Sequence, residues 1–162
     1  MKNYRVIAIP TKVASLVRAT EKAPGYGHPA HTEIATGHGP CRLCLKTFDI
    51  GKERRTLFTY DPFHGIEDIP LPGPVFIHAD GCERYAEDGG YPQDLLSHGA
   101  VLNAYGKGQN LVARIVVAAN AGHENAVEEL LRTEDVNYLE VRDREAGCFD
   151  FRIEPNLTSH RR

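Results

Sequence analysis

Two separate runs of the chain hold the residues that are best able to do chemistry. Cys41 and Cys44 lie three positions apart, and His78 and Cys82 lie four positions apart. Thiolate sulfur and imidazole nitrogen are the usual ligands of tetrahedral zinc sites, and the Cys-x-x-Cys spacing lets one turn supply two of them. These four residues therefore form one candidate metal set, with zinc as the candidate ion.

Other interpretations of the cysteine pair stay open. No glycine follows Cys44 to let the backbone fold as in a typical zinc knuckle, and a His-x-x-x-Cys spacing is a loose signal. Both points favour free thiols that pack as small hydrophobic residues. A redox-active pair would need Cys41 at the start of a helix, where the helix dipole lowers the pKa of the thiol. The strand-like residues after Cys44 leave little room for such a helix, and a structural disulfide is uncommon in a reducing compartment.

A zinc-dependent deaminase is the most tempting false assignment. Such enzymes combine a His-x-Glu motif with a later Pro-Cys-x-x-Cys motif, and the chain has both, as His31-Thr32-Glu33 and the run Pro40 to Cys44. Only residues 34–39 separate them. A crossover between two helices with a strand between them needs about ten residues or more. The spacing therefore excludes a deaminase.

A cleft for a small ligand is a further hypothesis. If the guanidinium of Arg42 is buried, it must either pair with an internal carboxylate or carbonyl, or present its fork to an anionic ligand. Together with Tyr60, His78 and the irregular Asp61–Pro74 loop, Arg42 would then line a cleft for a small anionic molecule. The alternative is a non-catalytic domain that serves stability or a protein partner. Whether a reaction is catalysed stays open, and so does the oligomeric state.

Composition narrows the function classes. The chain has 162 residues and a net charge of −3, which fits one domain over residues 1–162. Its basic clusters are too small to form a nucleic-acid footprint. No apolar run approaches the ~20 residues of a membrane span. The apolar run near the N-terminus is too short for a secretory signal, so we expect a cytoplasmic protein with no membrane or nucleic-acid partner.

The apolar pattern predicts two helices and several hairpins. Helices are expected over Thr11–Lys22 and Asn120–Thr133, with His123 on the surface of the second. This order of elements indicates an α+β domain with a mostly antiparallel β-sheet. A hairpin should join Leu45–Phe48 to Thr56–Tyr60, and the two cysteine-containing runs should meet at one end of the sheet. The other expected strands are Tyr4–Ile9, His31–Thr36, Val75–Ala79, Ala100–Tyr105, Leu111–Ala118, Val136–Val141 and Phe149–Ile153.

Several short motifs occur in a fixed order from about residue 39 to residue 154. They are Pro40-Cys41-Arg42-x-Cys44-Leu45, Leu57-x-x-Tyr60-x-Pro62-Phe63, Gly73-Pro74-Val75-Phe76-Ile77-His78, Tyr138-x-x-Val141 and Gly147-Cys148-Phe149. In this combination the chain resembles the bacterial "domain of unknown function 1203" family. The resemblance implies no assigned activity. One departure is Asn103-Ala104-Tyr105-Gly106, where the family resembles an Arg-Ala-Tyr-Asp pattern, so an arginine that would line a family site is missing.

Overall fold

Eight strands and two α-helices appear in the computed structural model, which describes residues 2–63, 66 and 71–156. They divide into two compact units. The terminal unit contains the described residues of Met1–Ile7 and Ala86–Arg162, and the central unit is Ala8–Tyr85. The predicted α+β class is confirmed, with the strands shared between two antiparallel sheets. The prediction of one domain over residues 1–162 stays a prediction.

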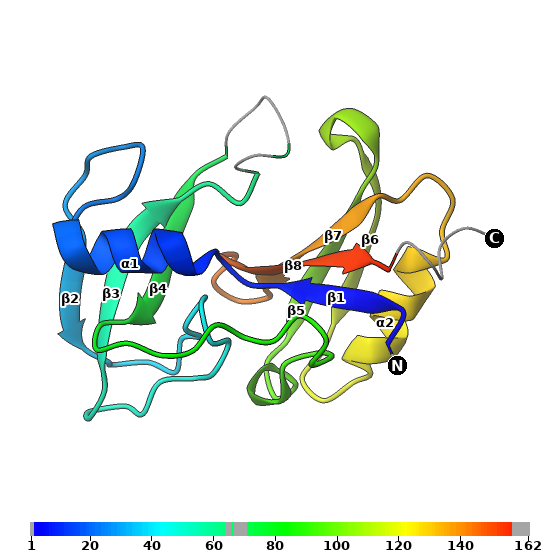
Figure 1. Cartoon of the computed structure of the whole chain (residues 1–162). Coiled ribbons are helices and arrows are strands. Elements are labelled where there is room, and N and C mark those ends of the chain that lie inside the picture. The colour runs from blue at the N-terminus through cyan, green and yellow to red at the C-terminus, as the bar shows by residue number, and fades with distance from the viewer. Residues whose placement is uncertain (1, 64–65, 67–70, 157–162) are drawn as a thin grey trace. The chain divides into compact units, whose positions relative to one another are not determined.

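The terminal unit is built on a five-stranded antiparallel sheet (Figure 1). Its strand order is β1-β8-β7-β5-β6, and helix α2 (His123–Leu131) packs on β5, β6 and β7. The hairpins β5–β6 and β7–β8 are the two that the sequence predicts in this half of the chain, and both are confirmed. The strands are β1 (Tyr4–Ile7), β5 (Ala100–Tyr105), β6 (Leu111–Val117), β7 (Tyr138–Asp143) and β8 (Phe149–Pro155).

Helix α2 buries the apolar face that its sequence predicts. Ala126, Val127, Leu130 and Leu131 are all buried, because residues three and four apart share one side of a helix. The prediction that His123 lies on the surface is wrong. Its side chain is buried, its ring lies 5.0 Å from that of Tyr91, and its Nε2 donates to a backbone carbonyl at 2.8 Å.

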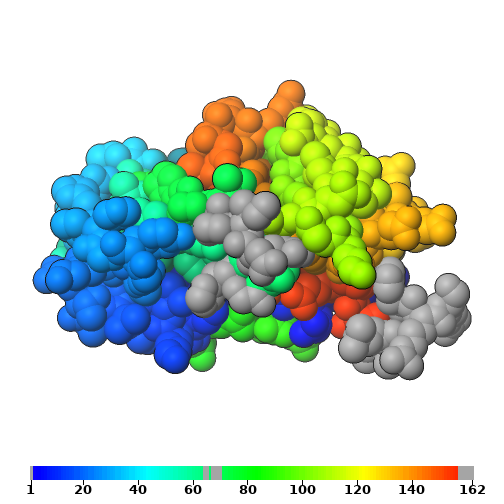
Figure 2. All heavy atoms as spheres, turned by 90° about the horizontal axis from the view of Figure 1, so that it is seen from above, coloured from blue at the N-terminus to red at the C-terminus, as the bar shows by residue number. Residues whose placement is uncertain are grey.

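Strand β6 forms one edge of the five-stranded sheet. Two of its apolar side chains face solvent, with Leu111 44% and Val116 52% exposed. The tip of the β5–β6 hairpin, in yellow-green, lies at the molecular surface in Figure 2. An exposed apolar edge of this kind offers unpaired backbone groups to other chains.

The central unit is built on a smaller antiparallel sheet of three described strands in the order β2-β3-β4. Helix α1 (Thr11–Thr20) passes in front of these strands in Figure 1 and buries Ala14 and Val17. Pro74 lies within β4, which is an edge strand, so its missing N–H breaks no pairing with a further described strand. The strands are β2 (His31–Ile34), β3 (Arg54–Tyr60) and β4 (Gly73–His78).

The expected hairpin between Leu45–Phe48 and Thr56–Tyr60 is wrong. Residues 45–48 form no strand, and β3 pairs instead with β2 and β4. Leu45 and Phe48 are both buried. Their burial produces an apolar pattern like that of a strand although the backbone there is a turn and a loop.

Parts of two predicted segments lie outside the described residues. In the Asp61–Pro74 loop these are residues 64–65 and 67–70, and at the C-terminus they include the basic cluster His160-Arg161-Arg162. Among the described residues, no helix has the length and apolar character to cross a membrane.

Candidate metal centre

A tight turn holds Cys41 and Cys44. The N–H of Leu45 donates to the carbonyl of Cys41 at 2.8 Å, and the N–H of Cys41 donates to the carbonyl of Lys46 at 2.9 Å. Leu45 adopts the left-handed conformation, with φ at 59°. Glycine usually occupies such a position, so its absence after Cys44 does not prevent the chain from forming this turn.

The left-handed Leu45 carries a cost that its side chain offsets. A non-glycine residue in this region is strained by roughly 1–3 kcal/mol. Leu45 is only 1% exposed, and burying a leucine side chain contributes about 1.5–3 kcal/mol. The packing of Leu45 is therefore of the right size to hold the turn that presents the two thiols.

Backbone pairing brings this turn to the end of β4. Cys41 forms a parallel bridge with Phe76, and the N–H of Arg42 donates to the carbonyl of Phe76 at 2.9 Å. The N–H of His78, the last residue of β4, donates to the sulfur of Cys41 at 3.3 Å. Gly81, with φ at 96°, then turns the chain, and Cys82 follows. The two runs that we expected to meet are therefore neighbours.

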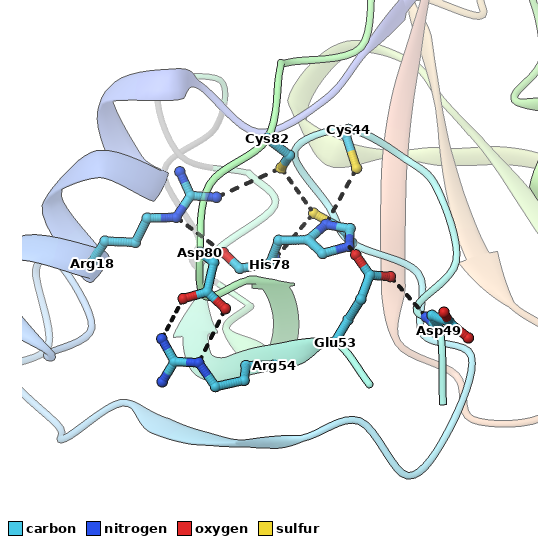
Figure 3. A network of polar contacts seen from close by, with 9 residues as sticks. Arg18, Cys44, Asp49, Glu53, Arg54, His78, Asp80 and Cys82 are labelled. Atoms are coloured by element: carbon cyan, nitrogen blue, oxygen red, sulfur yellow. Dashed lines mark hydrogen bonds and ion pairs between the residues drawn. The ribbon is translucent and has the colours of Figure 1, made fainter. Parts of the chain in front are cut away.

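The four candidate ligand atoms lie within 4.8 Å of one another. The sulfurs of Cys41 and Cys82 are 3.7 Å apart, and the sulfur of Cys44 is 3.5 Å from Nδ1 of His78. With metal–sulfur and metal–nitrogen bonds of about 2.3 and 2.1 Å, the edges of a tetrahedron are about 3.8 and 3.6 Å long. All four cysteines of the chain are free thiols. The group can therefore hold a metal ion, and Figure 3 shows it at close range.

Burial makes this a closed site. Cys41 is 0%, Cys44 5% and His78 8% exposed, and only Cys82 is of intermediate exposure. Structural zinc sites have four protein ligands, whereas catalytic sites keep a position for water or substrate. Three sulfurs and one nitrogen complete a tetrahedron, so the arrangement is of the structural kind.

A carboxylate orients the candidate histidine ligand. Nε2 of His78 lies 2.9 Å from Oε2 of Glu53, and Oε1 of Glu53 accepts the N–H of Asp49 at 2.8 Å (Figure 3). When Nε2 carries the proton that Glu53 accepts, the lone pair of Nδ1 is left for a metal. Sequence reasoning missed Glu53, since no spacing relates it to the four ligands.

A guanidinium completes the surroundings of the site. Arg18 on α1 donates from Nη2 to the sulfur of Cys82 at 3.6 Å and from Nε to the carbonyl of His78 at 3.0 Å (Figure 3). Arg18 therefore links α1 to both His78 and Cys82. Arg54 and Asp80 form an ion pair at the same end of β4.

All four candidate ligands lie in the part of the chain that matches a known protein family. A family model described as "Protein of unknown function (DUF1203)" matches residues 38–155, well over half of the chain. The chain belongs to this family. The expected resemblance is thereby confirmed, and the match also includes Glu53 but not Arg18. No curated protein and no solved structure matches the chain.

At Asn103, where the resemblance led us to expect a missing arginine, a guanidinium is present on the neighbouring strand. Asn103 is buried and pairs in register with Arg114 of β6. Nε of Arg114 donates to Oδ1 of Asn103 at 2.8 Å. A guanidinium therefore lies next to this position of the DUF1203 chain, supplied from β6 instead of β5.

Without a metal ion, the thiols and the imidazole of the DUF1203 site share protons. Hydrogen bonds from Cys44 and then Cys82 hold the pKa of Cys41 well below its usual range, while the bond to Cys41 raises the pKa of Cys44. Hydrogen bonds with Cys41 and Cys82 raise the pKa of His78 to about 10. A metal ion that binds all four groups must therefore displace protons from Cys44 and His78.

The candidate ligand-binding residues do not gather in one place. Arg42 is buried, and its Nη1 donates to the carbonyl of Pro40 at 2.5 Å, so an internal carbonyl partner is present. Tyr60 lies five residues along β3 from Arg55, which pairs with His78. That is roughly 17 Å at the rise of a strand. Tyr60 instead lines a separate hollow of about 340 Å³, together with Val13, Pro24, Gly25, Tyr26 and Asp61.

Proposed function

We propose that the central unit is a zinc-binding module, in which Cys41, Cys44, His78 and Cys82 hold one structural zinc ion. The observation that carries the proposal is the set of tetrahedron-like distances, 3.7 Å between two sulfurs and 3.5 Å between sulfur and Nδ1. Soft thiolates combined with imidazole at tetrahedral spacing suit zinc better than they suit magnesium or calcium, which take oxygen ligands.

Charge balance supports the same proposal. Three thiolates and one dication leave the site with a net charge of −1, and a buried charge needs a partner. The guanidinium of Arg18, 3.6 Å from the sulfur of Cys82, supplies the positive charge. The carboxylate of Glu53 is 41% exposed, so water solvates its charge, and it accepts a hydrogen bond from the far nitrogen of His78, as outer carboxylates do for zinc-bound histidines.

The role of such an ion is structural, because it would hold separate segments of the chain together. It would link the Cys41–Cys44 turn, the end of β4 and the loop at Cys82, and through Arg18 it would reach α1. The turn lies 34 positions before His78 when counted from Cys44, so zinc-binding energy would contribute directly to folding energy. An anion-binding cleft at Arg42 and His78 has less support, because both side chains are buried and hydrogen-bonded internally.

Metal analysis of the purified full chain tests the proposal. We expect one zinc per chain by mass spectrometry, and cobalt substitution should give the intense visible spectrum of a tetrahedral site with several thiolates. Cys41→Ser should lose the zinc, because a buried thiolate ligand is removed. Cys148→Ser is the matched control, since Cys148 is the one cysteine outside the group. Equal zinc content in the two variants, or a native protein without zinc, would contradict the proposal.

A further inference from the structure

Cys82 is the ligand within easiest reach of small molecules in solution. Cys41 and Cys44 are 0% and 5% exposed, whereas Cys82 is of intermediate exposure. Its neighbour Gly81 has φ at 96°, and a side chain added there would contact nothing within 4 Å. Cys82 therefore follows an open turn outside the regular strands, where a thiolate can both be approached and move.

Two neighbours equip Cys82 for oxidation. Arg18 donates to its sulfur at 3.6 Å, and as a ligand of the proposed zinc ion Cys82 is held as the thiolate, which is the reactive form of cysteine. The sulfur of Cys41 lies 3.7 Å from it. A disulfide has a sulfur–sulfur bond of about 2.05 Å, so a closure of about 1.7 Å would join the two residues.

We propose that Cys82 is a modification site for hydrogen peroxide, and that its oxidation releases the metal and joins Cys82 to Cys41. This inference rests on the proposed zinc centre. In the first step the Cys82 thiolate attacks one oxygen of the peroxide, the O–O bond breaks, and Cys82 becomes a sulfenic acid as hydroxide leaves. In the second step the Cys41 thiolate attacks the sulfur of Cys82, forms the S–S bond and expels a second hydroxide.

The electrons and ligands of this sequence balance. Two thiolates lose two electrons in total, and the peroxide takes both of them as it becomes two hydroxide ions. The zinc ion loses two of its four ligands, and Cys44 with His78 alone hold it weakly. A thiol reductant together with zinc would reverse the change. The module would therefore report peroxide by exchanging its metal for a disulfide.

The test measures zinc release from the zinc-loaded full chain with a chromophoric chelator while hydrogen peroxide is added. We expect release of the bound zinc, loss of two thiols, and a Cys41–Cys82 disulfide in the peptide map. The matched variants are Cys82→His and Cys44→His, which both keep four ligands of the same kinds. Cys82→His should no longer release zinc on peroxide treatment, whereas Cys44→His should release it as the native chain does.

The outcomes distinguish failure of the peroxide response from failure of the zinc centre. If the chain binds no zinc, the zinc centre itself fails, and the inference falls with it. Zinc that stays bound while peroxide is consumed would overturn the inference alone, and so would a Cys41–Cys44 disulfide in the native peptide map. That map requires no variant to fold. Cys148, which is also of intermediate exposure, serves in it as the internal control for general thiol oxidation.

Discussion

The terminal and central units differ in the elements that build them and in where the cysteines lie. The terminal unit has five strands, and α2 covers three of them with an apolar face. The central unit has three described strands and one helix, with long irregular segments between them. Three of the four cysteines lie in the central unit, and all three belong to the candidate metal group.

This difference indicates where each unit obtains its stability. Burial of apolar surface scales with the size of a core, and small cores often need a metal or a disulfide as a supplement. In the terminal unit, side chains such as Leu102, Val141 and Phe151 are fully buried on adjoining strands. In the central unit, which also buries apolar side chains such as Phe58 and Ile77, the proposed four-ligand centre would join segments that no continuous strand ladder connects. The zinc proposal therefore predicts that ligation adds to packing in the central unit and that packing alone suffices in the terminal unit.

Removal of the metal should have the largest effect and should separate the two units. Zinc binding at structural sites is worth on the order of 10 kcal/mol, which is comparable with the whole stability of a small domain. After chelation we expect backbone amides of Ala8–Tyr85 to lose protection from hydrogen exchange, while those of β5, β7 and β8 keep it. Mass spectrometry of peptides from the exchanged protein measures both.

Readdition of zinc to the chelated chain is the control and should restore protection in the central unit. Equal loss of protection in both units would contradict the comparison, since it would mean that the metal supports the five-stranded sheet as well. No loss in either unit would show that the central unit folds without ligation.

Leu139→Ala should have the next largest effect, in the other unit. Leu139 is 0% exposed and lies on β7, between β8 and β5. Deletion of a buried leucine side chain costs about 2–5 kcal/mol, so we expect a lower midpoint of denaturant unfolding for the terminal unit. Zinc content should stay at the native level. A variant that loses its zinc together with its stability would refute the division between packing and ligation.

Glu53→Gln should have the smallest effect of the three. The amide cannot accept the Nε2–H of His78 as strongly as the carboxylate does, and loss of such an outer partner weakens zinc affinity by about 10–100-fold. Competition with a chelator of known affinity measures the change. Glu33→Gln is the matched control, because Glu33 lies on β2 of the same unit but pairs with Arg55 at 2.8 Å. An equal loss of zinc affinity in both variants would contradict a specific role for Glu53 as the partner of His78.

The sequence predicted the terminal unit better than the central one, for a physical reason. Strands β5, β7 and β8 are mostly buried and helix α2 buries one face, so apolar residues are frequent in these strands and recur along the helix at its period. Around Leu45 and Phe48 the chain also buries apolar side chains, but it does so from a turn with a left-handed residue. A pattern of buried residues cannot distinguish that turn from a short strand.

The candidate site was predictable only in its ligands. The chain has four cysteines, and the Cys-x-x-Cys spacing of Cys41 and Cys44 pointed to a metal set that His78 and Cys82 could complete. Arg18 lies 64 positions from Cys82, and glutamates such as Glu53 are too common to stand out. Only the pairing of β3 with β4 and the packing of α1 bring these two residues to the site. Their roles are therefore a property of the tertiary structure.

The pairing of Arg114 with Asn103 also bears on the behaviour of the protein at high concentration. Arg114 is the central residue of β6, the edge strand Leu111–Val117 with exposed apolar side chains. Two copies that paired along the whole of this edge in antiparallel register would set Arg114 directly opposite Arg114. Like charges in that position repel, and charges on edge strands are a common defence against aggregation. The arginine that accompanies Asn103 thus also disfavours this self-pairing along the open edge of the sheet.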